Sequence, residues 1–161
     1  MSEKRIILIS ASPRATAQTT SAFLADRLEK QFGRTGARVS RIDARASLLT
    51  GHAEADFEAM RRADAWVLIF PLYFFCLPGL LMRFLQDFDR HRREHGGIVC
   101  KAKVYAVVNC GFPEPGINAE AVRVIARFAE KTDAAFRFGV MIGGGAMLHQ
   151  AQGTPLVKKM L

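Results

Sequence analysis

Short apolar stretches alternate with amphipathic stretches along the chain, and this pattern predicts its secondary structure. The predicted strands are residues 5–10, 38–42, 65–70, 104–108 and 136–142, and the predicted helices are residues 20–32, 53–62, 78–95 and 118–131. Strands 5–10, 65–70 and 104–108 are apolar throughout, which is typical of strands covered on both faces. Residues 43–53 lack any such period and are predicted to be irregular. The alternation predicts an α/β fold, with helices on both sides of a five-stranded parallel sheet.

Each predicted helix has an apolar face that should pack against this sheet. The residues predicted to point inward are Phe23, Leu24, Leu28, Phe32, Phe57, Met60, Val122, Ile125, Ala126 and Phe128. Pro78 suits the first turn of a helix, and Asn118 suits an N-cap. The length of 161 residues, without a repeat or a linker, predicts a single domain over residues 1–161.

Three loops are expected at the edge where ligands of parallel sheets bind, outside the carboxyl ends of the strands. They are residues 10–20, 71–77 and 109–116. The first loop carries serine and threonine hydroxyls around Arg14 and leads directly into a helix, which is typical of a phosphate site. Since this loop has neither glycine nor lysine, it is neither a dinucleotide fingerprint nor a P-loop, and it suits a single phosphate. The alternative is that Ser12 and Arg14 only cap a helix and solvate a loop.

The other two loops suit a flat ring. Tyr73, Phe74 and Phe75 lie on a proline-stiffened turn, and three consecutive aromatic residues of a turn cannot all point into the core. Gly111 allows close approach of the backbone. A single phosphate together with a planar polar ring describes a mononucleotide such as flavin mononucleotide (FMN). The alternative for the aromatic residues is an ordinary place in the core. Gly143 to Gly145 form either a plain turn or an opening for a second substrate.

Composition excludes several other classes of protein. The net charge is +8, but the basic residues are scattered apart from residues 91–93, and no aromatic residues interleave with that cluster, so no nucleic acid is expected. The basic residues are expected to form a solvated surface, and the alternative is that their positive potential attracts an anionic substrate. No apolar run reaches the ~18–20 residues of a membrane span, and no secretory signal precedes the first strand, so no membrane is expected. Cys76, Cys100 and Cys110 lack metal spacing, and free thiols suit the cytoplasm.

Other chemistries are weakly supported. A cysteine phosphatase needs C-x5-R, but Arg83 lies one position too far from Cys76, and Cys110 has Gly116 where the arginine should be. The chain has no G-x-S-x-G motif of a serine hydrolase. His91 and His95 have the spacing of metal ligands, but their charged neighbours predict an exposed helix end without a metal.

Two motifs carry a resemblance to a known family. Residues 11–20 read Ala-Ser-Pro-Arg-Ala-Thr-Ala-Gln-Thr-Thr, and residues 70–73 read Phe-Pro-Leu-Tyr, followed by Pro78-Gly79. With these motifs the chain resembles the flavodoxin-like NADPH-dependent FMN reductases. Ala11 and Ala17 replace common glycines of that group, and Gln18 replaces its asparagine. Residues 43–60 contain no cysteine, so the cluster of the related iron–sulfur flavoproteins is not expected.

The resemblance implies a doubly wound sheet with strand order 2-1-3-4-5 and a short or truncated last helix over residues 154–161. It also implies that loop residues bind FMN. The implied cofactor-binding residues are Ser10, Ser12, Arg14, Gln18, Thr19 and Thr20 around the phosphate, and Pro71, Leu72, Tyr73, Phe74, Phe75, Cys76, Asn109, Cys110, Gly111 and Phe112 around the ring.

The function implied is an NAD(P)H-dependent oxidoreductase that passes hydride from nicotinamide to FMN and on to a small acceptor, such as a quinone, a nitro or azo compound, or a flavin. No catalytic side chain is required, because the cofactor carries the chemistry. A homodimer or higher homo-oligomer is expected, since a partner subunit commonly completes the pocket in this family and would cover the sheet face that a short last helix leaves open. The alternatives are an electron-carrying flavodoxin, which is usually acidic, or a binding module without flavin.

Overall fold

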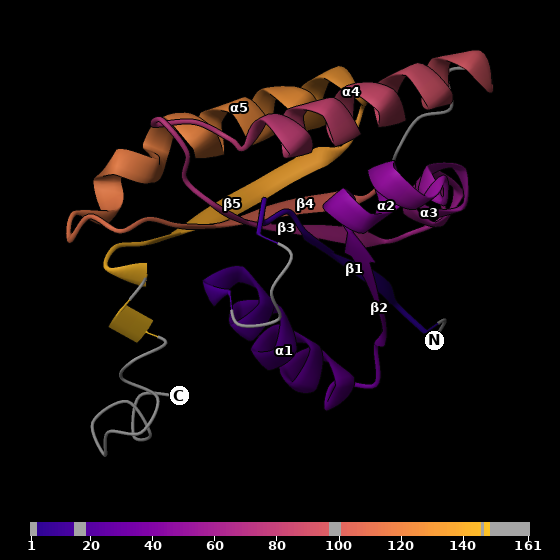
Figure 1. The fold of residues 1–161 in the computed structure, drawn as a ribbon. Helices are drawn as coiled ribbons and strands as arrows, with labels where there is room; N and C mark the ends of the chain where they lie inside the picture. Colours follow the sequence, from indigo (N-terminus) through magenta and orange to yellow (C-terminus); the bar gives the residue numbers. More distant parts are fainter. Residues whose placement is uncertain (1–2, 15–18, 97–100, 146, 149–161) are drawn as a thin grey trace.

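The computed structural model describes residues 3–14, 19–96, 101–145 and 147–148. Its centre is a parallel sheet of order β2-β1-β3-β4-β5, which confirms the expected topology (Figure 1). The strands are β1 (Arg5–Ser10), β2 (Arg38–Asp43), β3 (Ala65–Pro71), β4 (Lys103–Asn109) and β5 (Ala135–Ile142). All five lie within one or two residues of the ranges predicted from apolar runs.

The helices are unequally divided between the two faces of the sheet. They are α1 (Thr20–Gly33), α2 (Ala44–Thr50), α3 (Ala53–Arg61), α4 (Gly79–Glu94) and α5 (Ala119–Lys131), with a short 3-10 turn, η1 (Pro115–Asn118), before the last. Helices α4 and α5 lie side by side over one face, on the side where α2 and α3 also lie, whereas α1 lies on the opposite side (Figure 1). Among the helices that the structure describes, α1 therefore covers the second face alone.

Helix α2 corrects the prediction that residues 43–53 are irregular. The Asp43 carboxylate accepts hydrogen bonds from the backbone amides of Arg45 at 2.9 Å and Ala46 at 3.0 Å, and Gly51 ends the helix with a left-handed φ of 73°. An aspartate before and a glycine after a segment are start and stop signals of a helix. These signals were present in the sequence, but the segment is too short for its apolar period to stand out.

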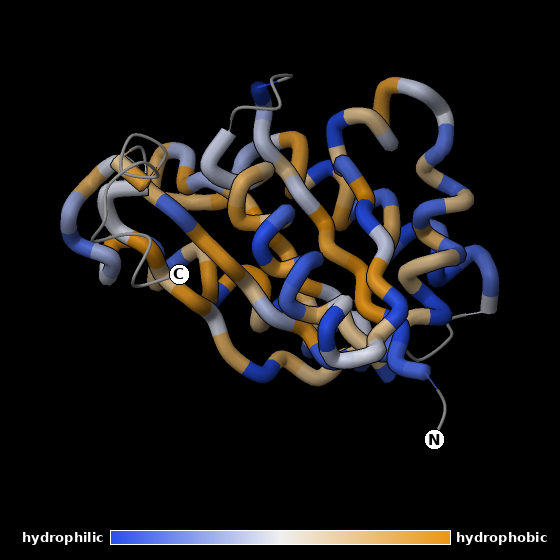
Figure 2. Tube along the Cα trace, turned by 90° about the horizontal axis from the view of Figure 1, so that it is seen from below, coloured by the Kyte–Doolittle hydropathy of each residue, from blue (hydrophilic) through white to orange (hydrophobic). Residues whose placement is uncertain are grey.

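The larger half of the core lies between the sheet and α3, α4 and α5. Phe57, Phe84 and Phe88 pack together there with Trp66, whose indole N–H donates to the Met60 carbonyl at 2.9 Å. Phe57 and Met60 are buried, as predicted. Seen from the α1 side, the longest apolar stretches follow the strands of the sheet (Figure 2). These runs explain why the strands could be located from hydropathy.

Several details of the helix faces differ from the predictions. In α1 the buried residues are Ser21 and Ala25, while Phe23, Leu24, Leu28 and Phe32 are only half-buried, because small side chains bring the helix close to the strands. In α5 the buried residues are Ala121, Ile125 and Ala129, with Val122, Ala126 and Phe128 half-buried. Asn118 precedes α5 as predicted but makes no side-chain capping hydrogen bond; its NH2 group donates to the Pro115 carbonyl at 3.0 Å.

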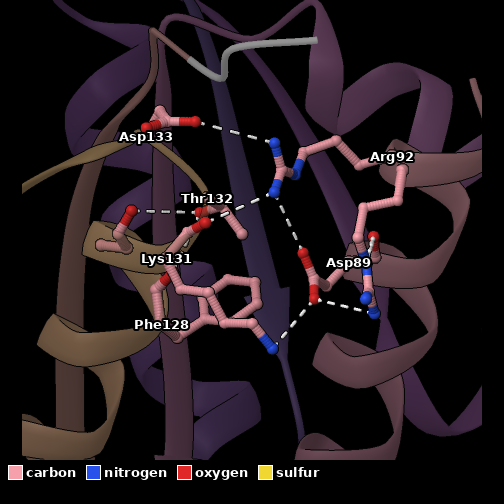
Figure 3. A network of polar contacts seen from close by, with 8 residues as sticks. Asp89, Arg92, Phe128, Lys131, Thr132 and Asp133 are labelled. Atoms are coloured by element: carbon pink, nitrogen blue, oxygen red, sulfur yellow. Dashed lines mark hydrogen bonds and ion pairs between the residues drawn. The ribbon is translucent and has the colours of Figure 1, made fainter. Parts of the chain in front are cut away.

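The end of α4 corrects a second prediction. His91 and Arg92 are buried rather than part of an exposed charged end. Asp89, also buried, lies 3.2 Å from Arg92 and 3.0 Å from the Lys131 ammonium, and Arg92 further donates to the Lys131 carbonyl at 3.3 Å (Figure 3). This ionic network joins the C-terminal ends of α4 and α5. The charged residues around His91 therefore serve the packing of two helices.

Strand β5 is an edge strand with an exposed apolar stripe. Phe138 and Val140 lie on the α1 side of the sheet, 57% and 43% exposed, and the Phe138 ring contacts Tyr105 at a centroid distance of 5.1 Å. Helix α1 packs on β1, β2 and β3 and leaves this stripe uncovered among the described residues. The predicted last helix, residues 154–161, lies outside the described residues. In the described part of the chain, no helix has the length and apolar character needed to cross a membrane.

Candidate functional site

All five parallel strands end at the same edge of the sheet, and the loops after four of them come together there. The register pairs Ser10 with Ile69, Pro71 with Asn109, and Asn109 with Ile142. The segments that follow β1, β3, β4 and β5 are therefore neighbours, although β1 ends at Ser10 and β5 only at Ile142. This edge is where open α/β sheets bind their ligands.

Asn109, the last residue of β4, connects several of these segments. Its buried side-chain amide donates to the Ser21 hydroxyl at 3.3 Å and to the Phe70 carbonyl at 3.2 Å. It thereby joins the end of β4 to α1 and β3. Asn109 was predicted to bind the ring, but its side-chain amide is engaged within the protein, and its backbone carbonyl accepts from the Leu72 amide at 2.7 Å. Ser21 was not among the predicted site residues, although it ends the run of hydroxyl residues.

The first loop keeps hydrogen-bond donors for an anion. The Ser12 oxygen accepts from the Arg14 amide at 3.3 Å, and the Thr19 oxygen caps α1 by accepting from the Ala22 amide at 3.1 Å. Because each oxygen acts as an acceptor in these bonds, each hydroxyl proton remains available for a phosphate oxygen. The Thr20 hydroxyl, by contrast, already donates to the Gly145 carbonyl at 3.0 Å. Ser12 and Thr19 are therefore the better-placed donors.

Electrostatics in this loop favour an anion as well. Arg14 is exposed, and the first turn of α1, all of it described, carries no acidic side chain that would neutralise the helix dipole. Ser10 points elsewhere, because its hydroxyl donates to the Ile42 carbonyl of β2 at 3.4 Å. Gln18 lies outside the described residues. Ala11 is buried and has no positive φ, so the loss of the common glycine needs no strained backbone at that position.

The second loop forms a tight turn with an unusual backbone. Tyr73 and Cys76 exchange two backbone hydrogen bonds of 2.9 Å, and Phe74 and Phe75 form the tip with φ values of 47° and 61°. Two positive φ values in succession suit asparagine and glycine, not aromatic residues. Phe74 is 96% exposed and Phe75 is 59% exposed. The structure thus keeps both rings outside the core at a cost in backbone strain, which is a common feature of functional sites.

The third loop packs against both of its neighbours. The Phe112 ring stacks on Phe75 at a centroid distance of 6.2 Å and an interplanar angle of 16°. Cys110 is buried, and its thiol lies 3.5 Å from the Phe112 carbonyl, so it presents no nucleophile at the surface. A Cβ added to Gly111 would meet no atom within 4 Å, which leaves the backbone there open to close approach.

Close packing explains why glycines follow β5. A Cβ on Gly143 would lie 2.1 Å from the Pro113 carbonyl oxygen, and one on Gly145 would lie 2.9 Å from the Asn109 amide oxygen. The backbone amides of Gly144 and Gly145 donate to the carbonyls of Phe112 and Cys110, each at 2.7 Å. The contacts favour a packed turn that holds the third loop in place over an opening for a second substrate.

Comparisons with known proteins agree with this architecture. A family model described as a flavodoxin-like fold matches residues 4–138. No curated protein matches the sequence.

Solved structures with the same fold have low sequence identity. An NAD(P)H:quinone oxidoreductase from Methanothermobacter marburgensis has a TM-score of 0.69 at 15% identity, covering 96% of each chain. General stress protein 14 from Treponema denticola, solved in complex with FMN, has a TM-score of 0.68 at 19% identity, covering 91% of this chain and 90% of its own. An azoreductase from Bacillus anthracis has a TM-score of 0.65 at 16% identity, covering 92% and 90%.

Proposed function

Because the chain belongs to the family with the flavodoxin-like fold, whose model matches residues 4–138, we propose that it binds FMN and acts as an NAD(P)H-dependent oxidoreductase. The observation that carries this proposal is the pairing of free hydroxyl donors at the α1 N-terminus with a strained, exposed aromatic turn one loop away. Such a pair provides a place for a phosphate and a place for a flat ring. Three similar structures bear names that specify azoreductase, NAD(P)H:quinone oxidoreductase or bound FMN, which supports the proposal.

The residues fit the phosphate end of FMN as follows. The hydroxyls of Ser12 and Thr19 donate to phosphate oxygens, and Arg14 supplies a positive charge. The α1 dipole adds to the attraction, by about 0.3–1 kcal/mol for an exposed anion at a helix N-terminus. Thr20 contributes through the backbone, because its hydroxyl is already donated to Gly145.

The ring end is formed by the second and third loops. The backbone amides of Phe74 and Phe75 make no backbone hydrogen bond among the described residues, so they are available to polar atoms of the ring. Tyr73 and Phe74 would cover the ring, and Gly111, where a Cβ would meet no atom within 4 Å, would let the backbone approach it. When bound, FMN supplies the redox chemistry: it accepts hydride from NAD(P)H and passes electrons to a small acceptor such as a quinone, a nitro or azo compound, or a free flavin.

The arrangement of the whole protein is part of the same proposal. We expect residues 1–161 to form one FMN-binding domain that works in the cytoplasm, where its free thiols, Cys76 and Cys110, stay reduced. We also expect a homodimer or higher homo-oligomer, because both the tip of the aromatic turn and the apolar stripe of β5 are exposed.

The first test is FMN binding by the anchor residues. Replacing Arg14 and Thr19 together by alanine should weaken FMN binding more than roughly tenfold, since a charge and a hydroxyl donor are lost and tenfold corresponds to about 1.4 kcal/mol. The measurement is fluorescence titration of flavin-free protein with FMN. An unchanged dissociation constant would exclude this loop as the phosphate site.

Two matched variants control for unrelated effects. Arg34→Ala removes an equal charge from the far end of α1 and should leave FMN affinity within about twofold, because exposed charges more than a Debye length apart are screened. Thr19→Ser keeps the hydroxyl and the helix cap, so it should also bind normally. Circular dichroism checks that each variant is folded.

The second test separates the proposed enzyme from its alternatives. The absorbance spectrum of protein purified without added flavin shows whether FMN is retained. Oxidation of NADH and NADPH is then followed under air and with quinone or azo acceptors. Bound FMN without nicotinamide oxidation would indicate an electron carrier, and failure to bind FMN at all would indicate a binding module without flavin.

A further inference from the structure

Two pairs of metal-ligating side chains face each other across α3 and α4, remote from the proposed FMN site. Glu54 and Glu58 lie one turn apart on α3, and His91 in the last turn of α4 lies four residues before His95, which follows the helix as its C-cap. One ligand atom from each of Glu54, His91 and His95 lies within 4.8 Å of the others. The imidazole rings themselves are close, with centroids 4.1 Å apart. Small rotations of the side chains therefore bring three ligands to one point.

Neighbouring hydrogen bonds show which nitrogen of each ring is the donor. Nδ1 of His95 lies 2.8 Å from the backbone carbonyl of His91, and a carbonyl only accepts, so this nitrogen carries the proton. Nε2 of His91 lies 3.0 Å from a carboxylate oxygen of Glu58 and donates to it in the same way. In the neutral form of each ring, the lone pair is then on Nε2 of His95 and on Nδ1 of His91. A second hydrogen bond that orients an imidazole is the usual support of a histidine that binds a metal.

We propose that Glu54, His91 and His95 bind a divalent transition-metal ion of the Zn²⁺ type, with Glu58 as a positioning residue for His91. Two imidazoles and a carboxylate suit Zn²⁺, whereas Ca²⁺ and Mg²⁺ prefer oxygen ligands alone. Glu58 is held by Arg61 and lies 3.8 Å from Arg62, so it acts behind His91 and not as a ligand. His91 is buried while Glu54 and His95 are exposed, so the ion can enter from solvent and keep a water molecule.

The expected role of this ion is structural. His91 lies twelve residues along α4 from Gly79, which is roughly 18 Å at 1.5 Å per residue, so the site is far from the loops at the start of α4. An ion held by α3 and α4 cross-links two helices that pack over the same face of the sheet. It should stabilise the folded chain in proportion to its affinity and concentration, because the ligands are assembled only in the folded state.

The test is titration of the full-length, metal-free and tag-free protein with ZnCl₂ by calorimetry under reducing conditions. We expect one Zn²⁺ per chain and an increase in melting temperature on binding. His95→Ala and Glu54→Gln should each weaken binding by at least roughly tenfold and remove the thermal shift. His52→Ala is the control, since His52 lies just before α3 outside the group and its loss should leave both readouts unchanged.

Cobalt provides an independent readout of the ligands. Co²⁺ bound by nitrogen and oxygen gives d–d bands without the thiolate charge-transfer band that cysteine ligands would produce. A thiolate band, no binding by the wild type, or equal affinities of wild type and His95→Ala would each overturn the proposal. Circular dichroism verifies folding, and the experiment needs no FMN, so its outcome is independent of the proposed oxidoreductase function.

Discussion

At the scale of single residues, the backbone of the aromatic turn is the most unusual feature of the protein. Phe74 and Phe75 both adopt positive φ, a region that costs a residue with a side chain on the order of 1–3 kcal/mol. Phe74 recovers little of this by packing, because almost all of its surface is exposed. A strained and exposed aromatic residue is better explained by contact with a ligand or a partner than by stability.

Replacing Phe74 by asparagine should stabilise the flavin-free protein while weakening FMN binding. Asparagine tolerates the left-handed region, so we expect the free energy of unfolding in urea to rise by roughly 1 kcal/mol. The same variant loses the ring proposed to cover the flavin. Phe112→Asn is the control, because Phe112 is also exposed but has no positive φ, and it should bring no stabilisation. A Phe74 variant of lower stability would contradict the strain argument.

At the scale of helices and strands, the ion pairs of Asp89 join α4 to α5 at their C-terminal ends (Figure 3). Burial raises the pKa of Asp89, but the hydrogen bonds from Lys131 and Arg92 outweigh it and hold the pKa below its ordinary value of 3.8. The carboxylate is therefore charged in the folded protein at every pH above this value. Basic residues near the ends of both helices also match the negative end of the helix dipole.

Asp89→Asn should be strongly destabilising, by roughly 3–5 kcal/mol, because it leaves the buried guanidinium of Arg92 without its main partner. Since the folded pKa is depressed, the stabilisation is present above pH 3.8 and is lost as the pH falls through the lower folded pKa. The difference in unfolding free energy between wild type and variant should thus be constant between about pH 5 and pH 7. It should become smaller as the pH falls below 3.8.

The control for this prediction is Asp133→Asn. Asp133 also contacts Arg92, at 3.7 Å, but is largely exposed, so its loss should cost less than about 1 kcal/mol. Urea unfolding at several pH values measures both variants. If the unfolding free energies of wild type and Asp89→Asn differ little, or if their difference grows as the pH falls, the ion pairs contribute little to stability.

At the scale of the whole molecule, the unequal cover of the two sheet faces is the main consequence of the fold. Four described helices lie on one face and α1 on the other, where the stripe formed by Phe138 and Val140 of β5 is exposed. Exposed apolar stripes on a sheet edge are common sites of association. A second copy of the chain is the occupant we expect, in agreement with the proposed homo-oligomer.

Val140→Lys should weaken self-association by roughly tenfold or more, which is about 1.4 kcal/mol, because a charge would be buried in an apolar contact. Sedimentation equilibrium over a range of protein concentrations measures the effect. Leu49→Lys is the control, since Leu49 is also an exposed apolar residue but lies on α2. If the wild type is monomeric at all concentrations, or if both variants have an equal effect, this face is not the surface of self-association.

The predictions from sequence succeeded where long-range packing follows directly from local pattern. The strands were found because residues such as Ile69 and Val108 lie in continuous apolar runs, which only a doubly covered sheet accommodates. Predictions for α2 and for the end of α4 were wrong. A seven-residue helix is too short to show a period, and the sequence around His91 is charged although the chain buries it against α3 and α5.

The placement of the loops around the candidate site was predicted for the same reasons. Placement of the loops follows from strand order, so the hydroxyl loop and the aromatic turn were both located at the correct edge. The roles of individual side chains were not predictable. Whether Asn109 faces a ligand or holds β4 to α1, and whether Thr20 or Thr19 keeps a free donor, depends on atoms more than 80 residues away in the chain.

The sequence by itself determined the alternation of strands and helices, the edge where loops meet, and the run of hydroxyls that suits a phosphate. These depend on the order of apolar and polar residues, which is a local property. Only the tertiary structure decided the left-handed turn at Phe74 and Phe75, the burial of His91 beside Glu58, and the exposed stripe of β5. Each of these results from contacts between distant segments, or from the lack of such contacts among the described residues, and hydropathy along a chain carries no information about either.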